Sequence, residues 1–265
     1  LSSGFSNGLN ANHVLGQTDF VSSLLGNSQT GMNAPRGIVY DPTTKRLFVA
    51  QTTGDRISIY DLTNGITSDG MNATYVIGQQ NFTTVTSNST QDGLSAPTGI
   101  LVDAPNNRLY VLETNNHRVS IFSLTTGIGN NMAASHVLGQ ADFVTATAAQ
   151  TQAGMNVPYG VALSGSTIFV SNSTGNRVTV YTGATLATGM NATKVLGQPD
   201  FTTATAAQTQ AGMNVPRGIA YDTAHQILYV AQTTPSHRIT SYDLSSNFTN
   251  GKNAVHVLGQ ANFTA

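Results

Sequence analysis

The chain has 265 residues, only 9% of them charged, and a formal net charge of −1. An ordinary globular protein has about 25% charged residues, so this chain lacks the positive charge that attracts proteins to nucleic acid or anionic membranes. It contains no cysteine, which excludes disulfides, thiolate metal sites and a cysteine nucleophile.

Uncharged polar residues, mainly Ser, Thr, Asn and Gly, take the place of charge. This composition is typical of secreted or surface-displayed proteins, so we expect an extracellular or cell-surface location. No apolar run approaches the roughly 18 residues of a membrane-spanning helix, and no membrane insertion is expected. No signal peptide is visible at Leu1, which favours a mature or excised form.

An internal repeat dominates the sequence. A short apolar segment ending in Gly-Gln occurs five times, and its glycines are 62, 61, 58 and 62 residues apart: Gly16, Gly78, Gly139, Gly197 and Gly259. A Pro-x-Gly marker starts at Pro35, Pro97, Pro158 and Pro216. The segment 145–158 recurs letter for letter at 203–216.

The first unit predicts four short strands in chain order. They are expected at 37–40, at 46–50, at 56–60 with period-two alternation, and at 75–77. The later units repeat this order, with strands beginning at Gly99, Arg108, Arg118 and His136, then at Gly160, Thr167, Arg177 and Lys194, then at Gly218, Ile227, Arg238 and His256.

Repeated units of four antiparallel strands are typical of propeller blades. The pattern Pro-x-Gly-[Ile/Val], a strand ending in Val-Ala-Gln or Val-Leu-Glu, and an Asn-x-x-Arg-Val turn resembles the NHL repeat, most closely between Pro97 and Val119. The resemblance implies an all-β propeller. These units are longer than usual NHL units because a Thr/Gln/Ser-rich loop, such as 81–96, is inserted.

We therefore predict one β-propeller domain over residues 1–265, with four blades of about 60 residues. The blades are expected at 33–79, 95–140, 156–198 and 214–260, preceded by an extra outer strand and its lead-in at 1–20. Four blades is the low end of the usual range of about four to eight. The units could also form part of a larger ring completed by another chain.

The extra segment, His13–Gln17, has no third strand before it in the sequence. It could close the ring and leave His256–Gln260 spare. It could instead be an unpaired edge that adds to a neighbouring molecule, which gives a ring or a filament when repeated. A third reading is that the chain was cut from a longer array.

Four arginines recur at the start of the third strands: Arg56, Arg118, Arg177 and Arg238. A guanidinium has five donors, so we expect these side chains to bind carbonyls or a carboxylate between blades. The carboxylates considered are those that end first strands, at Asp41, Asp103 and Asp222. The functional alternative is an anion-binding ring of four arginines. The second position of the Pro-x-Gly marker holds Arg36 and Arg217 in two units and Thr98 and Tyr159 in the others. This alternation suggests a channel mouth whose lining differs between blades.

A candidate ligand face consists of His117, His237 and Glu113. The two histidines occupy equivalent turns before the repeat arginine, and Glu113, the only glutamate, replaces Gln51 and Gln232 of sister blades. Two histidines without a third ligand are weak evidence for a metal, so we expect no cofactor, no metal and no catalytic set. His13, His136 and His256 share one outer-strand slot and are expected to lie apart on the surface.

Asn-x-Ser/Thr sequons make glycosylation of an exported chain a further expectation, at Asn72, Asn81, Asn88, Asn172, Asn191, Asn247 and Asn262. The favoured function is a non-enzymatic structural or adhesive repeat protein that associates with itself, for instance as a filament subunit joined by strand exchange. The alternatives are a propeller that binds a glycan or protein ligand through its loop face, and an NHL-type lyase or hydrolase.

Overall fold

The computed structural model describes residues 7–183 and 185–264. They form sixteen strands in four antiparallel sheets, and each sheet keeps the order of its strands in the sequence. No helix that is long and apolar enough to cross a membrane occurs among these residues.

Each sheet is one blade. Blade 1 contains β1 (Pro35–Asp41), β2 (Arg46–Gln51), β3 (Arg56–Asp61) and β4 (Tyr75–Ile77). Blade 2 contains β5 (Pro97–Asp103), β6 (Arg108–Glu113), β7 (Arg118–Ser123) and β8 (His136–Leu138). Blade 3 contains β9 (Pro158–Ser164), β10 (Thr167–Asn172), β11 (Arg177–Tyr181) and β12 (Lys194–Leu196). Blade 4 contains β13 (Pro216–Asp222), β14 (Ile227–Gln232), β15 (Arg238–Asp243) and β16 (His256–Leu258). The predicted all-β propeller fold of four four-stranded blades is confirmed.

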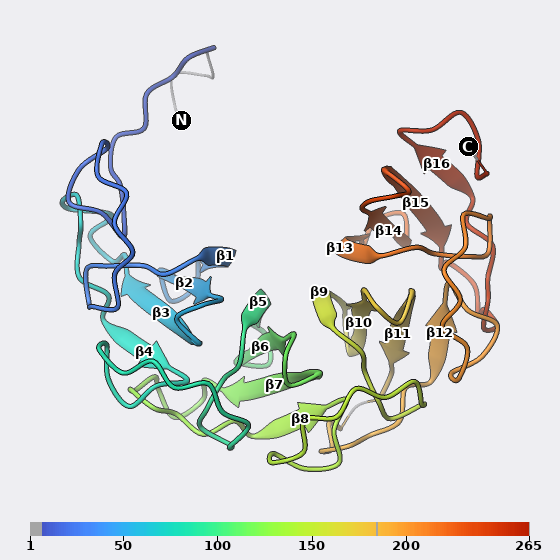
Figure 1. Ribbon diagram of the computed structural model, residues 1–265, viewed down its shortest axis with the longest axis horizontal. Coiled ribbons are helices and arrows are strands. Elements are labelled where there is room, and N and C mark those ends of the chain that lie inside the picture. Colours follow the sequence, from blue (N-terminus) through green and yellow to red (C-terminus); the bar gives the residue numbers. More distant parts are fainter. Residues whose placement is uncertain (1–6, 184, 265) are drawn as a thin grey trace.

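The blades follow one another around an open arc (Figure 1). The first strands, β1, β5, β9 and β13, line its concave side, and the fourth strands lie on its outer rim. Blades 1 and 4 stand at the two ends of the arc. At each contact between blades, the back face of one blade meets the front face of the next blade in the sequence. The same names are used for the outward faces of blades 1 and 4.

The hydrophobic core lies between the blades. Three clusters join the back of one blade to the front of the next, as Ile57 and Ile59 of blade 1 do with Leu109 and Val111 of blade 2. The other two clusters join blade 2 to blade 3 and blade 3 to blade 4. Because blade 2 has a neighbouring blade on both faces, its strands β6 and β7 are almost continuously buried.

The Pro-x-Gly marker has a steric cause at the concave side. A Cβ atom on Gly37 would lie 2.2 Å from the carbonyl oxygen of Thr98 in the next blade, and one on Gly160 would lie 2.2 Å from that of Arg217. Only glycine permits the first strands to approach this closely.

The predicted extra outer strand is not formed. Residues 13–17 make a single bridge, Gly16 to Gly31, and no strand. A fourth strand pairs with a third strand, and the described residues contain none for this segment. Blade 1 still holds it, because Gly70 donates its N–H to the Val14 carbonyl at 3.0 Å and Val14 donates to Asp69 Oδ1 at 3.1 Å. Residues 1–6 of the predicted lead-in lie outside the described residues.

Candidate functional site

The four repeat arginines are buried within the loop layers between blades, with 0–3% of each residue exposed. One Nη group of each donates to a phenylalanine carbonyl in the loop after its own blade: Arg56 to Phe82, Arg118 to Phe143, Arg177 to Phe201 and Arg238 to Phe263. The other Nη group donates to the loop before the blade, as Arg118 does to Gly93 O at 3.1 Å. The guanidinium thus ties two successive loops together.

The strand-end carboxylates do not take part in these contacts. Asp41 accepts from Thr43 N at 2.9 Å, Asp103 accepts from Asn106 Nδ2 at 2.9 Å, and Asp222 contacts His225 Nδ1 at 2.7 Å. Each therefore anchors its own hairpin turn. The arginines bind backbone carbonyls, and their burial leaves them no open ring in which to receive an anion.

Glu113 is fully buried (0% exposed) beneath the surface of blade 2. Its carboxylate accepts from Arg118 Nε at 2.7 Å, Asn116 Nδ2 at 2.7 Å, Ser120 Oγ at 2.5 Å and Ser95 N at 3.0 Å. Burial raises the pKa of Glu113 from its ordinary value, and the neighbouring Arg118 charge opposes that rise. The carboxylate has no open path to a ligand, so it does not form a face with the two histidines.

His117 joins blade 2 to blade 3. Its residue has a positive φ of 50°, and its Nδ1 accepts the backbone N–H of Val157 at 3.1 Å. The residues at the equivalent position in blades 1 and 3 make the same contact. Asp55 accepts from Ala96 N at 2.7 Å, and Asn176 accepts from Val215 N at 2.9 Å. Burial lowers the pKa of His117, which keeps Nδ1 free to accept.

His237 occupies that position in blade 4, the last blade among the described residues. Its residue is exposed, and within the described residues its ring makes no hydrogen bond. No group of three or more His, Asp or Glu side chains that could hold a metal ion occurs in the described part of the chain.

The sequons differ in exposure. Asn72, Asn81, Asn191, Asn247 and Asn262 are exposed, and Asn88 is half-buried. Asn172 is fully buried (0%) in β10 and donates to Val170 O and Thr179 Oγ1, both at 3.1 Å. In the folded chain Asn172 therefore has no room for a glycan.

The second residues of the Pro-x-Gly markers meet at the concave rim. Arg36 of β1 donates from Nη1 to the Tyr159 hydroxyl of β9 at 2.7 Å, and the Arg217 guanidinium lies 4.7 Å from the centre of the Tyr159 ring. An open hollow of about 370 Å³ lies beside them and includes His117 and Thr98 in its lining. The Arg217–Tyr159 pair is a cation–π contact, so these marker residues join first strands of different blades.

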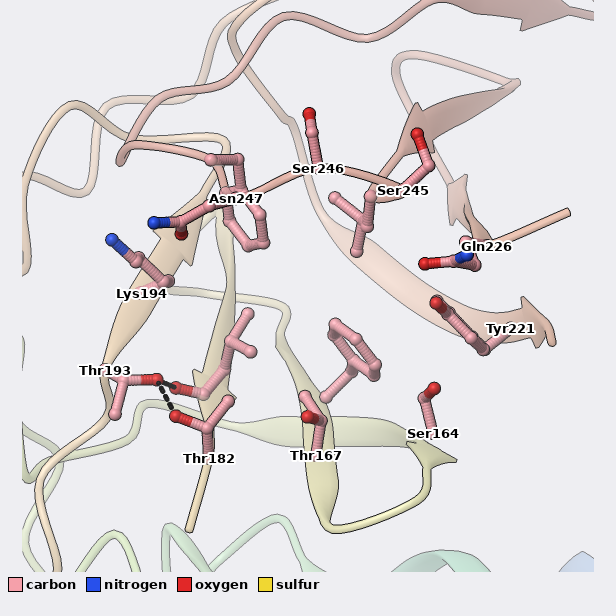
Figure 2. Close-up of a pocket in the computed structure, with 14 residues that line it drawn as sticks. Ser164, Thr167, Thr182, Thr193, Lys194, Tyr221, Gln226, Ser245, Ser246 and Asn247 are labelled. Carbon is pink, nitrogen blue, oxygen red and sulfur yellow. Dashed lines mark hydrogen bonds between the residues drawn. The ribbon is translucent and has the colours of Figure 1, made fainter.

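A second hollow, of about 400 Å³, lies between blades 3 and 4 (Figure 2). Phe169 and Tyr221 stack in it with ring centres 5.2 Å apart, and hydroxyl and amide side chains such as Thr182, Gln226 and Asn247 surround them. Blade 3 has a shorter β9–β10 turn than its sisters. The shortened repeat spacing of 58 residues was the sequence signal for this departure from symmetry, but it did not predict a hollow.

Comparison with known proteins supports the fold. Residues 94–122 match the family model of the NHL repeat. No curated protein matches. Among solved structures, hydrazine synthase of Kuenenia stuttgartiensis superposes with a TM-score of 0.54 at 14% identity over 96% of this chain and 52% of that one. A chain of a nidogen/laminin complex gives a TM-score of 0.52 at 15% identity over 88% of this chain and 66% of that one. The chain thus spans less than two thirds of either structure, and at these identities the likeness shows the fold alone.

Proposed function

We propose that this chain is a non-enzymatic structural protein, exported from the cell or displayed on its surface, that serves as a repeat module in an assembly. The low charge and the exposed sequons support export. The roles of the singled-out residues support a structural task, because the repeat arginines, Glu113 and His117 all hold neighbouring loops or blades in place.

One observation carries the assembly role. The two ends of the arc present apolar residues that are more exposed than their counterparts at the contacts between blades. Ile38 in β1 is 66% exposed and Leu258 in β16 is 57% exposed, whereas Leu138 and Leu196, the counterparts of Leu258, are 0% exposed. Exposed apolar surface of this kind is typical of protein–protein contacts.

Electron microscopy and light scattering of the purified chain at physiological salt test the proposal. We expect ordered rings or filaments whose proportion rises with protein concentration. Single chains at every concentration would contradict the assembly role. Deletion of residues 1–20 should abolish the assemblies if the N-terminal segment joins them.

The hollow between blades 3 and 4 favours a second candidate function, the binding of an uncharged polar ligand such as a glycan. Its aromatic pair and its hydroxyl and amide side chains are groups that proteins use to fix the orientation of small polar molecules (Figure 2). Saturable binding of a glycan that is lost in a Gln226→Ala variant would support this candidate, and a glycan screen without saturable binding would contradict it.

A further inference from the structure

The back face of blade 4, formed by Gly218, Ala220, Ala231 and Ile239, has the features of a blade contact, although the described residues contain no following blade. Ile239 is 38% exposed, although its counterparts Ile57, Val119 and Val178 are 0% exposed. A Cβ atom on Gly218 would have no neighbour closer than Ala231 Cβ, at 3.8 Å. The sequence thus keeps a glycine here that only a following blade requires.

The front face of blade 1 has the complementary features. Ile38 and Tyr40 are 66% and 48% exposed, whereas the matching residues of blade 4, Ile219 and Tyr221, pack into the core shared with blade 3. Ala34, just before the first Pro-x-Gly marker, is the counterpart of Ala96 and Val157, which precede later markers.

Hydrogen bonding at the two ends is complementary as well. Each of Ala96, Val157 and Val215 donates its N–H to a side chain of the preceding blade. Within the described residues Ala34 N–H has no such acceptor, and the matching acceptor slot of blade 4 holds His237, whose ring makes no hydrogen bond. The donor at one end of the chain therefore matches the acceptor at the other.

The two ends also carry the same outer-strand sequence. His13–Gln17 and His256–Gln260 are both His-Val-Leu-Gly-Gln. Asp69 and Gly70 of blade 1 form hydrogen bonds with the first copy. Blade 4 contacts β12 in the same way, since Asn250 Oδ1 accepts from Val195 N at 3.1 Å. β16 pairs with β15, but the described residues contain no further blade that contacts it, and two of its three residues are exposed.

We propose that blade 4 of one molecule packs against blade 1 of a second copy of this chain, in the register of the internal blade contacts. In that contact His13–Gln17 of the second copy takes the place of His256–Gln260 beside β15. The replacement is favoured because His13–Gln17 also keeps its contacts with Asp69 and Gly70 of its own blade 1. The proposal rests on the assembly role and names its partner and its surfaces. Because the two surfaces differ, repeated contacts generate a closed ring or an open filament.

A Gly218→Ala variant tests the packing of the two faces. The added Cβ has open space in the single chain. In the docked pair it would overlap the Arg36 carbonyl, as a Cβ on Gly160 would overlap that of Arg217. We expect association to weaken about tenfold to a hundredfold by light scattering, while the melting temperature of the chain is not lowered.

Engineered cysteines test the strand replacement, since the chain has no native cysteine. Ser241 pairs with His256 in the register of β15 and β16, so His13 should lie opposite Ser241 in the docked state. Directly opposite residues have Cβ atoms about 4.5–5.5 Å apart, close to disulfide range. The variant Ser241→Cys/His13→Cys should form disulfide-linked oligomers under mild oxidation.

The control, Ser241→Cys/His256→Cys, should form a disulfide within one chain, lock β16 in place and remain monomeric. Linkage of positions 13 and 241 within a single chain, or no linkage, would overturn the proposal. If the unmodified chain assembles but Gly218→Ala does not weaken assembly, this interface is wrong while the structural role stands. If the unmodified chain never assembles, both fail.

Discussion

Among single residues, the buried ion pair of Glu113 and Arg118 is the clearest departure of one blade from its sisters. Both side chains are 0% exposed, and removing a charge pair from water costs free energy that their attraction must offset. Blades 1 and 4 have a glutamine in this slot, and its Oε1 accepts from the repeat arginine at 3.2 and 3.3 Å. The blade therefore does not require the carboxylate.

A Glu113→Gln variant should change the free energy of unfolding by less than about 1 kcal/mol at pH 7, because glutamine satisfies Arg118 Nε. Glu113→Ala should cost about 3–5 kcal/mol, because it leaves a buried guanidinium without that partner. Urea denaturation of both variants measures the difference. An equal loss in the two variants would show that the charge itself is required.

The same comparison has a predicted pH dependence. Burial raises the pKa of Glu113 in the folded chain, so the folded state holds this proton more tightly than the unfolded state. Stability of the natural chain relative to Glu113→Gln should therefore fall as the pH rises above about 4, and level off above the folded-state pKa. A relative gain over that range would contradict the raised pKa.

His117 gives a pH dependence of opposite sign. Burial lowers its pKa, so its contribution to stability is present above the unfolded pKa of about 6.5 and is lost as the pH falls from there. His117→Asn supplies the acceptor that Asn176 provides in blade 3. The melting temperature of the natural chain should fall more between pH 7 and pH 5 than that of the variant. Parallel curves would contradict this role.

At the scale of strands, the Pro-x-Gly glycines predict a position-dependent response to one substitution. Gly160→Ala should lower the free energy of unfolding by about 1–3 kcal/mol, because its Cβ would overlap the Arg217 carbonyl of β13. Gly218→Ala should leave stability unchanged or raise it by about 0.5–1 kcal/mol, since glycine is costly inside a strand. Chemical denaturation measures both. Equal losses would contradict the steric explanation.

The strands were predictable because the repeat places the same markers in every unit. The predicted fourth strand 75–77 matches β4, and the other strands of that unit differ by one or two residues at their ends. The segment 13–17 was predicted as a strand and is not one, because a strand needs a partner and sequence pattern alone does not supply it. The acceptors of the repeat arginines were unpredictable for a related reason, since backbone carbonyls leave no mark in a sequence.

At the scale of the whole molecule, the period of the repeat identified the blades but not their arrangement as an open arc (Figure 1). The candidate ligand face did not form because equivalent repeat positions lie in different blades. His117 and His237 belong to blades 2 and 4, and Glu113 lies inside blade 2. The rim contact of Arg36, Tyr159 and Arg217 depends on the curvature that brings first strands together, which no local pattern encodes.

The glycine contacts on the concave side also determine the curvature of the arc. A blade acts as a wedge, and the angle of a wedge depends on how thin its inner edge is compared with its outer edge. Contact between bare backbones at Gly37, Gly99 and Gly160 makes the inner edge as thin as a polypeptide permits. Bulkier residues there would flatten each wedge, so more units would be needed to complete one turn.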